Sequence, residues 1–272
     1  MRQSPEATLP VPAPATIALP PPPALPANAA LFLDVDGCLL PFAPRPDAVE
    51  VPPALLARLI VLQRALGGAL ALVSGRNLAT LDQLFAPEVF AAAGLHGVER
   101  RRSGATGVAG EVPAALVRAR DAAIALIHDH PGALVEDKGA ALGLHWRMVA
   151  HERKADAALA LRAFAAGALS GLPDYQLQPG DHVIELRPRH ADKGGAILAF
   201  LEEAPFAGRV PVFAGDDLTD EPGFSAVNAR GGISVLVGNR PGSGACFRLP
   251  DPAAIHAWLG VAAAEPNTEN SR

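Results

Sequence analysis

Cysteine and long apolar runs are both scarce in this chain of 272 residues. Its two cysteines, Cys38 and Cys246, cannot make a disulfide framework and are not paired at a spacing that suits zinc. Although half of the residues are hydrophobic, no run of about 18 lacks a charge or a helix breaker, so no transmembrane helix is predicted. These absences favour a protein of the reducing cytoplasm that has no membrane partner.

The chain also lacks a concentrated positive charge. Its formal net charge is −5, and the basic residues are scattered, apart from Arg100, Arg101 and Arg102, which we place at a turn. A nucleic-acid partner is therefore not expected.

Proline, by contrast, is abundant at the start of the chain. Residues 1–28 hold nine prolines and almost no charge, which predicts a proline-rich, disordered tail. The same prolines interrupt every apolar run that a signal peptide would need. We also expect a flexible C-terminal tail over residues 263–272.

Apolar runs alternate with amphipathic segments in two parts of the chain. Strands are predicted at residues 30–35, 69–73, 209–217 and 231–239, and helices at residues 51–66, 77–85 and 192–204. This rhythm is typical of an α/β fold with a doubly wound, Rossmann-like parallel sheet. We assign this core domain to residues 29–103 and 190–262.

The segment 104–189 has a different character. Helices are predicted over residues 110–130 and 151–169, and short alternating strands over residues 132–139, 141–149 and 181–189. This grouping predicts a small α+β cap domain inserted into the core domain.

Two clusters of acids follow predicted strands of the core. Asp34 and Asp36 end the first strand, and the segment GDDLTDE, residues 215–221, ends a later one. The carboxyl ends of parallel strands meet at one edge of a sheet, where so many like charges repel one another unless a cation offsets them. Magnesium prefers such oxygen ligands, although acids are also common at the start of a helix.

Donors for a phosphate group occur at two further places. Ser74 and Gly75 end the second strand just where a helix begins, and they offer a hydroxyl and backbone N–H groups. Lys193 begins another helix and offers a cation that can approach a phosphate closely.

The order strand-DVDG, strand-SGR, Lys-Gly and strand-GDD resembles the four motifs of the haloacid-dehalogenase-like superfamily, from about residue 30 to residue 258. The resemblance implies that Asp34 is a nucleophile that forms an aspartyl phosphate and that Asp36 is the general acid and base. It also implies that Ser74, Gly75 and Lys193 hold the phosphoryl group.

The same resemblance implies a Mg²⁺ cofactor held by Asp34, the backbone carbonyl of Asp36, and Asp216. One position departs from the superfamily, because Cys38 stands where a threonine is usual. We predict that Cys38 is a small core residue rather than a catalytic thiol.

The cap lies between Ser74 and Lys193, a placement that in the superfamily goes with sugar phosphatases and phosphomannomutases. Its segments VEDKGAALGLHWR and PGDHVIELRP, with GLHGVE before them and GDDLTDE after them, resemble signature segments of trehalose-6-phosphate phosphatases. The resemblance implies hydrolysis of trehalose 6-phosphate, the last step of trehalose biosynthesis. It also implies that Glu136, Lys138 and Glu185 bind the glucose unit distant from the phosphate.

Several alternatives stay open at this point. His145 and Arg187 are either sugar ligands or structural residues, His96 is either a loop residue or lies near the phosphate, and Trp146 is more often a core aromatic than a sugar platform. A phosphomutase, a sucrose-phosphate phosphatase or a non-catalytic sensor domain would share the core motifs. The partner that the sequence predicts is a sugar phosphate, and we expect a monomer.

Overall fold

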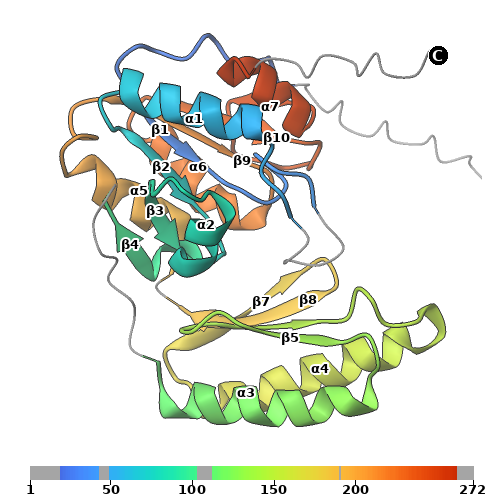
Figure 1. Cartoon of the computed structure of the whole chain (residues 1–272). Helices are drawn as coiled ribbons and strands as arrows, with labels where there is room; N and C mark the ends of the chain where they lie inside the picture. The colour runs from blue at the N-terminus through green and yellow to red at the C-terminus, as the bar shows by residue number, and fades with distance from the viewer. Residues whose placement is uncertain (1–18, 43–48, 103–111, 190, 262–272) are drawn as a thin grey trace, which may run out of the picture.

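The computed structural model describes residues 19–42, 49–102, 112–189 and 191–261, which form two units (Figure 1). The larger unit contains β1 (Ala29–Leu33), α1 (Pro53–Ala65), β2 (Leu70–Val73), α2 (Leu78–Leu84), β3 (Ala91–Gly94), β4 (Glu99–Arg101), α5 (Lys193–Leu201), β9 (Val210–Gly215), α6 (Glu221–Asn228), β10 (Ile233–Val237), β11 (Phe247–Leu249) and α7 (Pro252–Leu259). The smaller unit contains α3 (Ala114–Leu126), β5 (Leu134–Asp137), β6 (Leu142–His145), α4 (Lys154–Leu169), β7 (Tyr175–Gly180) and β8 (Val183–Pro188).

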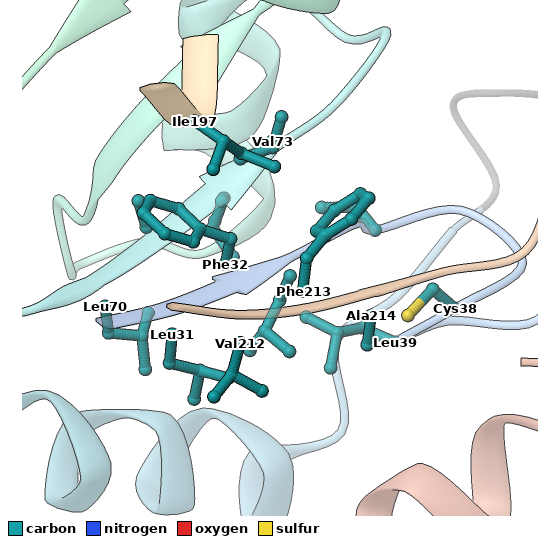
Figure 2. Close-up of a cluster of buried hydrophobic side chains, with 14 of the residues drawn as sticks. Leu31, Phe32, Cys38, Leu39, Leu70, Val73, Ile197, Val212, Phe213 and Ala214 are labelled. Atoms are coloured by element: carbon teal, nitrogen blue, oxygen red, sulfur yellow. The ribbon is translucent and has the colours of Figure 1, made fainter. Parts of the chain in front are cut away.

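The larger unit is built on a seven-stranded sheet with the order β11-β10-β9-β1-β2-β3-β4. All neighbouring strands are parallel except β3 and β4, which pair antiparallel. Successive residues of β1 point to opposite faces and are buried on both: Leu31 lies on the side of α1, and Phe32 lies on the side of Ile197 from α5 (Figure 2). The doubly wound parallel sheet predicted from the sequence is confirmed.

Cys38 is completely buried in this core, near the end of β1 (Figure 2). Burial raises the pKa of its thiol well above the usual range, and the nearby charge of Asp34 raises it further. The thiol therefore stays protonated, and Cys38 is a core residue as predicted.

The smaller unit is an antiparallel sheet with the order β5-β6-β8-β7, covered on one face by α3 and α4 (Figure 1). Ile184 and Leu186 of β8 point into the core between this sheet and its helices. Glu185 and Arg187 alternate with them along β8, so they face the opposite side of the sheet, towards the larger unit. Trp146 is only 3% exposed within the same core, and the guanidinium of Arg162 lies over its ring. Trp146 is thus a core aromatic.

The first described residues correct one prediction. The N–H of Arg248 in β11 donates to the carbonyl of Pro20, and the indole N–H of Trp258 in α7 donates to the carbonyl of Pro23. A polyproline-like backbone makes no hydrogen bonds of its own, so its carbonyls are available to neighbouring donors. The prediction of a disordered tail over residues 1–28 is therefore wrong for residues 19–28, whereas residues 1–18 and the predicted tail 263–272 lie outside the described residues.

Several other predictions from the sequence can be compared with the structure. The turn expected at Arg100–Arg102 is wrong, because Arg100 and Arg101 belong to the edge strand β4, where they pair with Glu203 and Asp82. The strands β3, β4, β7 and β11 and the helices α6 and α7 were not predicted. The domain boundaries expected at residues 103/104 and 189/190 involve residues outside the described ranges, so their positions stay predictions. Among the described helices, none has the length and apolar character needed to cross a bilayer.

Candidate active site

A cavity of about 670 Å³ lies between the two units, at the carboxyl ends of the central strands. Asp34 follows β1, Ser74 follows β2 and Asp216 follows β9, so the sheet brings the three to one edge. Every site residue predicted from the sequence lines this cavity, namely Asp34, Asp36, Ser74, Gly75, Glu136, Lys138, Glu185, Lys193 and Asp216.

Lys193 is the buried cation of the site. Its Nζ lies 2.8 Å from Oδ1 of Asp34 and 2.7 Å from Oδ1 of Asp220, and its side chain is 2% exposed. Burial alone would lower the pKa of Lys193, but the negative charges of Asp220 and Asp34 outweigh burial and raise it well above the usual range. The ammonium therefore remains charged beside Asp34.

Asp220 holds this arrangement together, a role that the sequence did not reveal. While Oδ1 accepts from Lys193, Oδ2 accepts the backbone N–H groups of Asp216 (2.8 Å) and Asp217 (2.9 Å). Both oxygens are thus engaged, and Asp220 fixes the loop that carries Asp216. A Cβ at Gly215 would lie 2.3 Å from Cγ of Asp220, so glycine is needed there.

The carboxylate oxygens at this end of the cavity suit a divalent cation. Carboxylate oxygens of Asp34, Asp216 and Asp220 lie within 4.8 Å of one another, and the buried Oδ1 of Asp216 has no hydrogen-bond partner. Burial, aided by the charges of Asp220 and Asp217, raises the pKa of Asp216 to about 8, and burial also raises that of Asp34. Because Asp220 is already bonded through both oxygens, Asp34 and Asp216 are the side chains that remain for a hard cation.

Asp36 and Arg76 form a bidentate pair at the cavity wall. Nε and Nη2 of Arg76 each lie 2.7 Å from a carboxylate oxygen of Asp36. The backbone N–H of Arg76 also donates to Oγ of Ser74, at 3.2 Å. Arg76 thus joins the loop after β1 to the loop 74–76 after β2. The sequence placed Arg76 beside Ser74 but did not indicate its partner.

The polar face of the smaller unit contributes the opposite wall. Glu136, Gly143, Glu185 and Gln178 lie side by side across the four strands. A Cβ at Gly143 would lie 3.0 Å from Nε2 of His145 and 3.2 Å from Oε2 of Glu136, so glycine leaves room for these two side chains. Nζ of Lys138 lies 2.8 Å from Glu185 and 3.8 Å from Glu136.

His145 is part of this charged network, since its Nε2 lies 2.8 Å from Oε2 of Glu136. Burial by itself would raise the pKa of Glu136, but the hydrogen bond with His145 and the charge of Lys138 lower it to about 2. Glu136 is therefore ionised at neutral pH, and His145 acts as its partner while also lining the cavity.

Arg187 and His96 are the remaining predicted candidates. Arg187 is buried on the same face of β8 as Glu185 but does not line the cavity, and its Nη2 donates to Oε1 of Gln178 at 3.2 Å. His96 lines the cavity from the larger unit, between Gly75 and Glu185.

The comparison with known proteins agrees with this geometry. Residues 32–248 match the model of a protein family described as Trehalose-phosphatase. The chain belongs to the trehalose-phosphatase family. A relative from Escherichia coli (strain K12), a trehalose-6-phosphate phosphatase, is 43% identical over 256 residues, which cover 92% of this chain and 93% of that protein.

Solved structures support the fold of this trehalose-phosphatase family member. The C-terminal domain of a trehalose-6-phosphate phosphatase from C. albicans is 21% identical and superposes with a TM-score of 0.73 over 88% of this chain and 97% of that domain. A haloacid dehalogenase-like hydrolase from Bacteroides thetaiotaomicron gives a TM-score of 0.61 at 14% identity, over 85% and 98% of the two chains. The family consists of phosphoric monoester hydrolases, and the chain is an enzyme of that class.

Proposed function

We propose that the protein hydrolyses trehalose 6-phosphate to trehalose and phosphate through an aspartyl phosphate on Asp34, with Mg²⁺ as its cofactor. The observation that carries the proposal is the shared cavity, which combines a buried carboxylate and ammonium at one wall with a charged, hydrogen-bonding sheet at the other. Its volume of about 670 Å³ lies in the range typical of sites for small molecules. The 43% identical relative is named for this activity.

In the first chemical step, a carboxylate oxygen of Asp34 attacks phosphorus and the oxygen of the sugar leaves. Lys193, 2.8 Å from Asp34, offsets the repulsion between this carboxylate and the phosphate dianion. Asp36 in its acid form gives a proton to the departing sugar oxygen, which releases trehalose. The hydroxyl of Ser74 and the N–H of Gly75 would hold the phosphoryl oxygens, since the N–H groups of Ser74 and Arg76 already donate to the carbonyl of Ala93 and to Oγ of Ser74.

In the second step, Asp36 takes a proton from water, and the water oxygen attacks the aspartyl phosphate. The bond between phosphorus and Asp34 breaks, which regenerates the carboxylate and releases inorganic phosphate. The contact with Arg76 places Asp36 at the cavity wall, and one of its two hydrogen bonds opens when that oxygen of Asp36 carries the proton.

Asp34, Asp216 and the backbone carbonyl of Asp36 would hold the Mg²⁺ ion. When bound, Mg²⁺ supplies positive charge that neutralises the carboxylates and the phosphoryl oxygens. Ligand atoms that cluster within 4.8 Å and the unpaired Oδ1 of Asp216 support this assignment.

Glu136, Lys138 and Glu185 would bind the glucose unit distant from the phosphate. Their charged groups lie on one face of the sheet, where ionised oxygens accept from sugar hydroxyls and the ammonium donates to them. The cytoplasmic location, the monomeric state and the domain boundaries stay predictions from the sequence.

Phosphate release from a panel of sugar phosphates tests the proposal. The panel contains trehalose 6-phosphate, sucrose 6-phosphate, glucose 6-phosphate and glucose 1-phosphate. We expect kcat/KM for trehalose 6-phosphate to exceed the others by about 100-fold or more, because the two monosaccharide phosphates do not span both walls of the cavity and the fructose ring gives sucrose 6-phosphate a different shape. A phosphomutase would instead yield an isomeric sugar phosphate with little inorganic phosphate, and a sensor domain would bind without turnover. Wild-type turnover that persists in Asp34→Asn would refute the nucleophile.

A further inference from the structure

The turn Leu95–Gly97, which follows β3, has an unusual backbone. Leu95 and His96 both have positive φ values, 50° and 56°, in the left-handed region that residues other than glycine rarely adopt. Two backbone hydrogen bonds of 2.9 Å hold the turn against the loop 74–76: Leu95 N–H donates to the carbonyl of Arg76, and His96 N–H to that of Ser74. Consecutive residues held in so rare a conformation point to a functional reason for it.

This backbone places the imidazole of His96 between the loop 74–76 and the smaller unit. On one side, a Cβ at Gly75 would lie 2.8 Å from Nε2, so only glycine leaves room for the ring. On the other side, Nε2 lies 3.8 Å from Oε1 of Glu185. Both side chains are less than a tenth exposed and line the cavity.

Several buried atoms in this region lack a hydrogen-bond partner, among them Nδ1 of His96, Oε1 of Glu185, and Nε and Nη1 of Arg187. The other carboxylate oxygen of Glu185 accepts from Lys138 at 2.8 Å. Buried polar atoms are almost always paired, and Nε2 of His96 lies 3.8 Å from Oε1 of Glu185, just outside hydrogen-bond distance. An approach of about 1 Å would bring Nε2 and Oε1 to hydrogen-bond distance.

His96 is suited to donate rather than to form an ion pair. Its burial, together with the positive charges of Lys193, Arg187 and Lys138, lowers the pKa of His96 well below its usual range. The ring is therefore neutral near pH 7, with one nitrogen that donates and one that accepts. With the proton on Nε2, the ring donates to Glu185, and Nδ1 accepts from water or from the substrate.

We propose that His96 is a positioning residue: when the smaller unit closes on the substrate, Nε2–H donates to Glu185 and fixes that carboxylate for a hydroxyl of the sugar. Glu185 is then held from two sides, by Lys138 of its own unit and by His96 of the other. Because the turn of His96 is bonded to the loop 74–76, closure over the sugar is coupled to the end of the cavity that we assign to the phosphate. The inference rests on the proposed function, which supplies the sugar.

Steady-state kinetics on two substrates test this role. Trehalose 6-phosphate requires the sugar contacts, whereas p-nitrophenyl phosphate has no sugar and requires only the chemistry at Asp34. In His96→Asn the backbone keeps its conformation, since asparagine tolerates the left-handed region, but the shorter amide does not reach Glu185. We expect KM for trehalose 6-phosphate to rise about 10-fold or more, with a change of about threefold or less in kcat/KM for p-nitrophenyl phosphate.

Three comparisons complete the experiment. His96→Gln carries an N–H near the position of Nε2 and should restore most of the affinity, and the exposed His128→Asn on the smaller unit serves as the matched control. In a Glu185→Ala background, His96→Asn should have no further effect on KM, because the group that it positions is gone.

The possible contrary results are distinct. Equal losses on both substrates, or effects of His96→Asn and Glu185→Ala that multiply, would overturn the positioning role, because His96 would then act on the loop 74–76 or on the fold. A wild-type enzyme that hydrolyses p-nitrophenyl phosphate but not trehalose 6-phosphate would overturn the proposed function together with this inference.

Discussion

Asp220→Asn is the substitution that tests the architecture of the site most directly. Asp220 is completely buried and accepts three hydrogen bonds, from Lys193 Nζ at 2.7 Å and from the N–H groups of Asp216 and Asp217 at 2.8 and 2.9 Å. An asparagine has the same shape, but its amide nitrogen must face either the ammonium or the two backbone N–H groups. In either orientation, the amide N–H groups would face other hydrogen-bond donors without an acceptor between them.

The expected loss of stability follows from these contacts. Each hydrogen bond to a charged group contributes about 1.5–3 kcal/mol, and removal of one member of a buried ion pair costs about 3–5 kcal/mol. We therefore expect Asp220→Asn to lower the free energy of unfolding by about 3–5 kcal/mol. Urea unfolding should be followed in saturating Mg²⁺, so that repulsion among the remaining carboxylates is offset.

The catalytic effect comes from Lys193, which loses one of its two anionic partners. Displacement of a catalytic group by about 1 Å can cost about 100-fold in rate, so we expect kcat to fall by about 10- to 100-fold. Asp217→Asn is the matched control for stability on the same loop, because its exposed side chain caps the short helix 218–220 and accepts from Thr219, and asparagine caps a helix as well as aspartate does. An Asp220→Asn enzyme within about 1 kcal/mol of the wild type, with unchanged kcat, would refute this reasoning.

Three further predictions concern other parts of the site. Gly37→Ala should raise the Mg²⁺ concentration needed for activity and destabilise the protein by about 2 kcal/mol or more, because φ of Gly37 is +85° and the new Cβ would lie 2.2 Å from Oδ2 of Asp216. Gly208 has a φ of +75° and open space around it, so urea unfolding of Gly208→Ala measures the backbone cost alone. Asp216→Asn should lower Mg²⁺ affinity about 10-fold or more in a titration of activity against Mg²⁺ after chelation, and equal affinity in both enzymes would argue against Asp216 as a ligand. The Glu136 carboxyl has a pKa of about 2 instead of 4.5, so its contribution to stability is present above pH 4.5 and is lost as the pH falls through about 2. The difference in unfolding free energy between the wild type and Glu136→Gln should therefore narrow by about 2 kcal/mol between pH 7 and pH 3, and a constant difference would contradict the pKa.

Much of the core site could be predicted because its residues follow buried strands. Parallel strands end at a common edge, so Asp34, Ser74 and Asp216 were expected to meet once their strands were recognised. The short strand β3, Ala91–Gly94, carries no such signal, since three alanines and a glycine fit a helix, a turn or a strand. The turn of His96 that follows β3 was for that reason not placed.

Contacts between side chains that are far apart in the sequence could not be predicted. Arg76 is 40 residues from Asp36, and Asp220 is 27 residues from Lys193, and many other acids and cations would have satisfied the same composition. The proline-rich segment 19–28 gave a misleading signal for the same reason, because its partners Arg248 and Trp258 lie at the other end of the chain.

The sequence by itself determined which chemical groups stand at the strand ends and which alternate on the strands of the smaller unit, because periodicity and strand order are local properties of the chain. The tertiary structure alone decided which of those groups touch: Lys193 between two aspartates, Arg76 on Asp36, and His96 opposite Glu185. Such contacts depend on the packing of two units and on distances of a few ångströms, and no local pattern in a sequence encodes them.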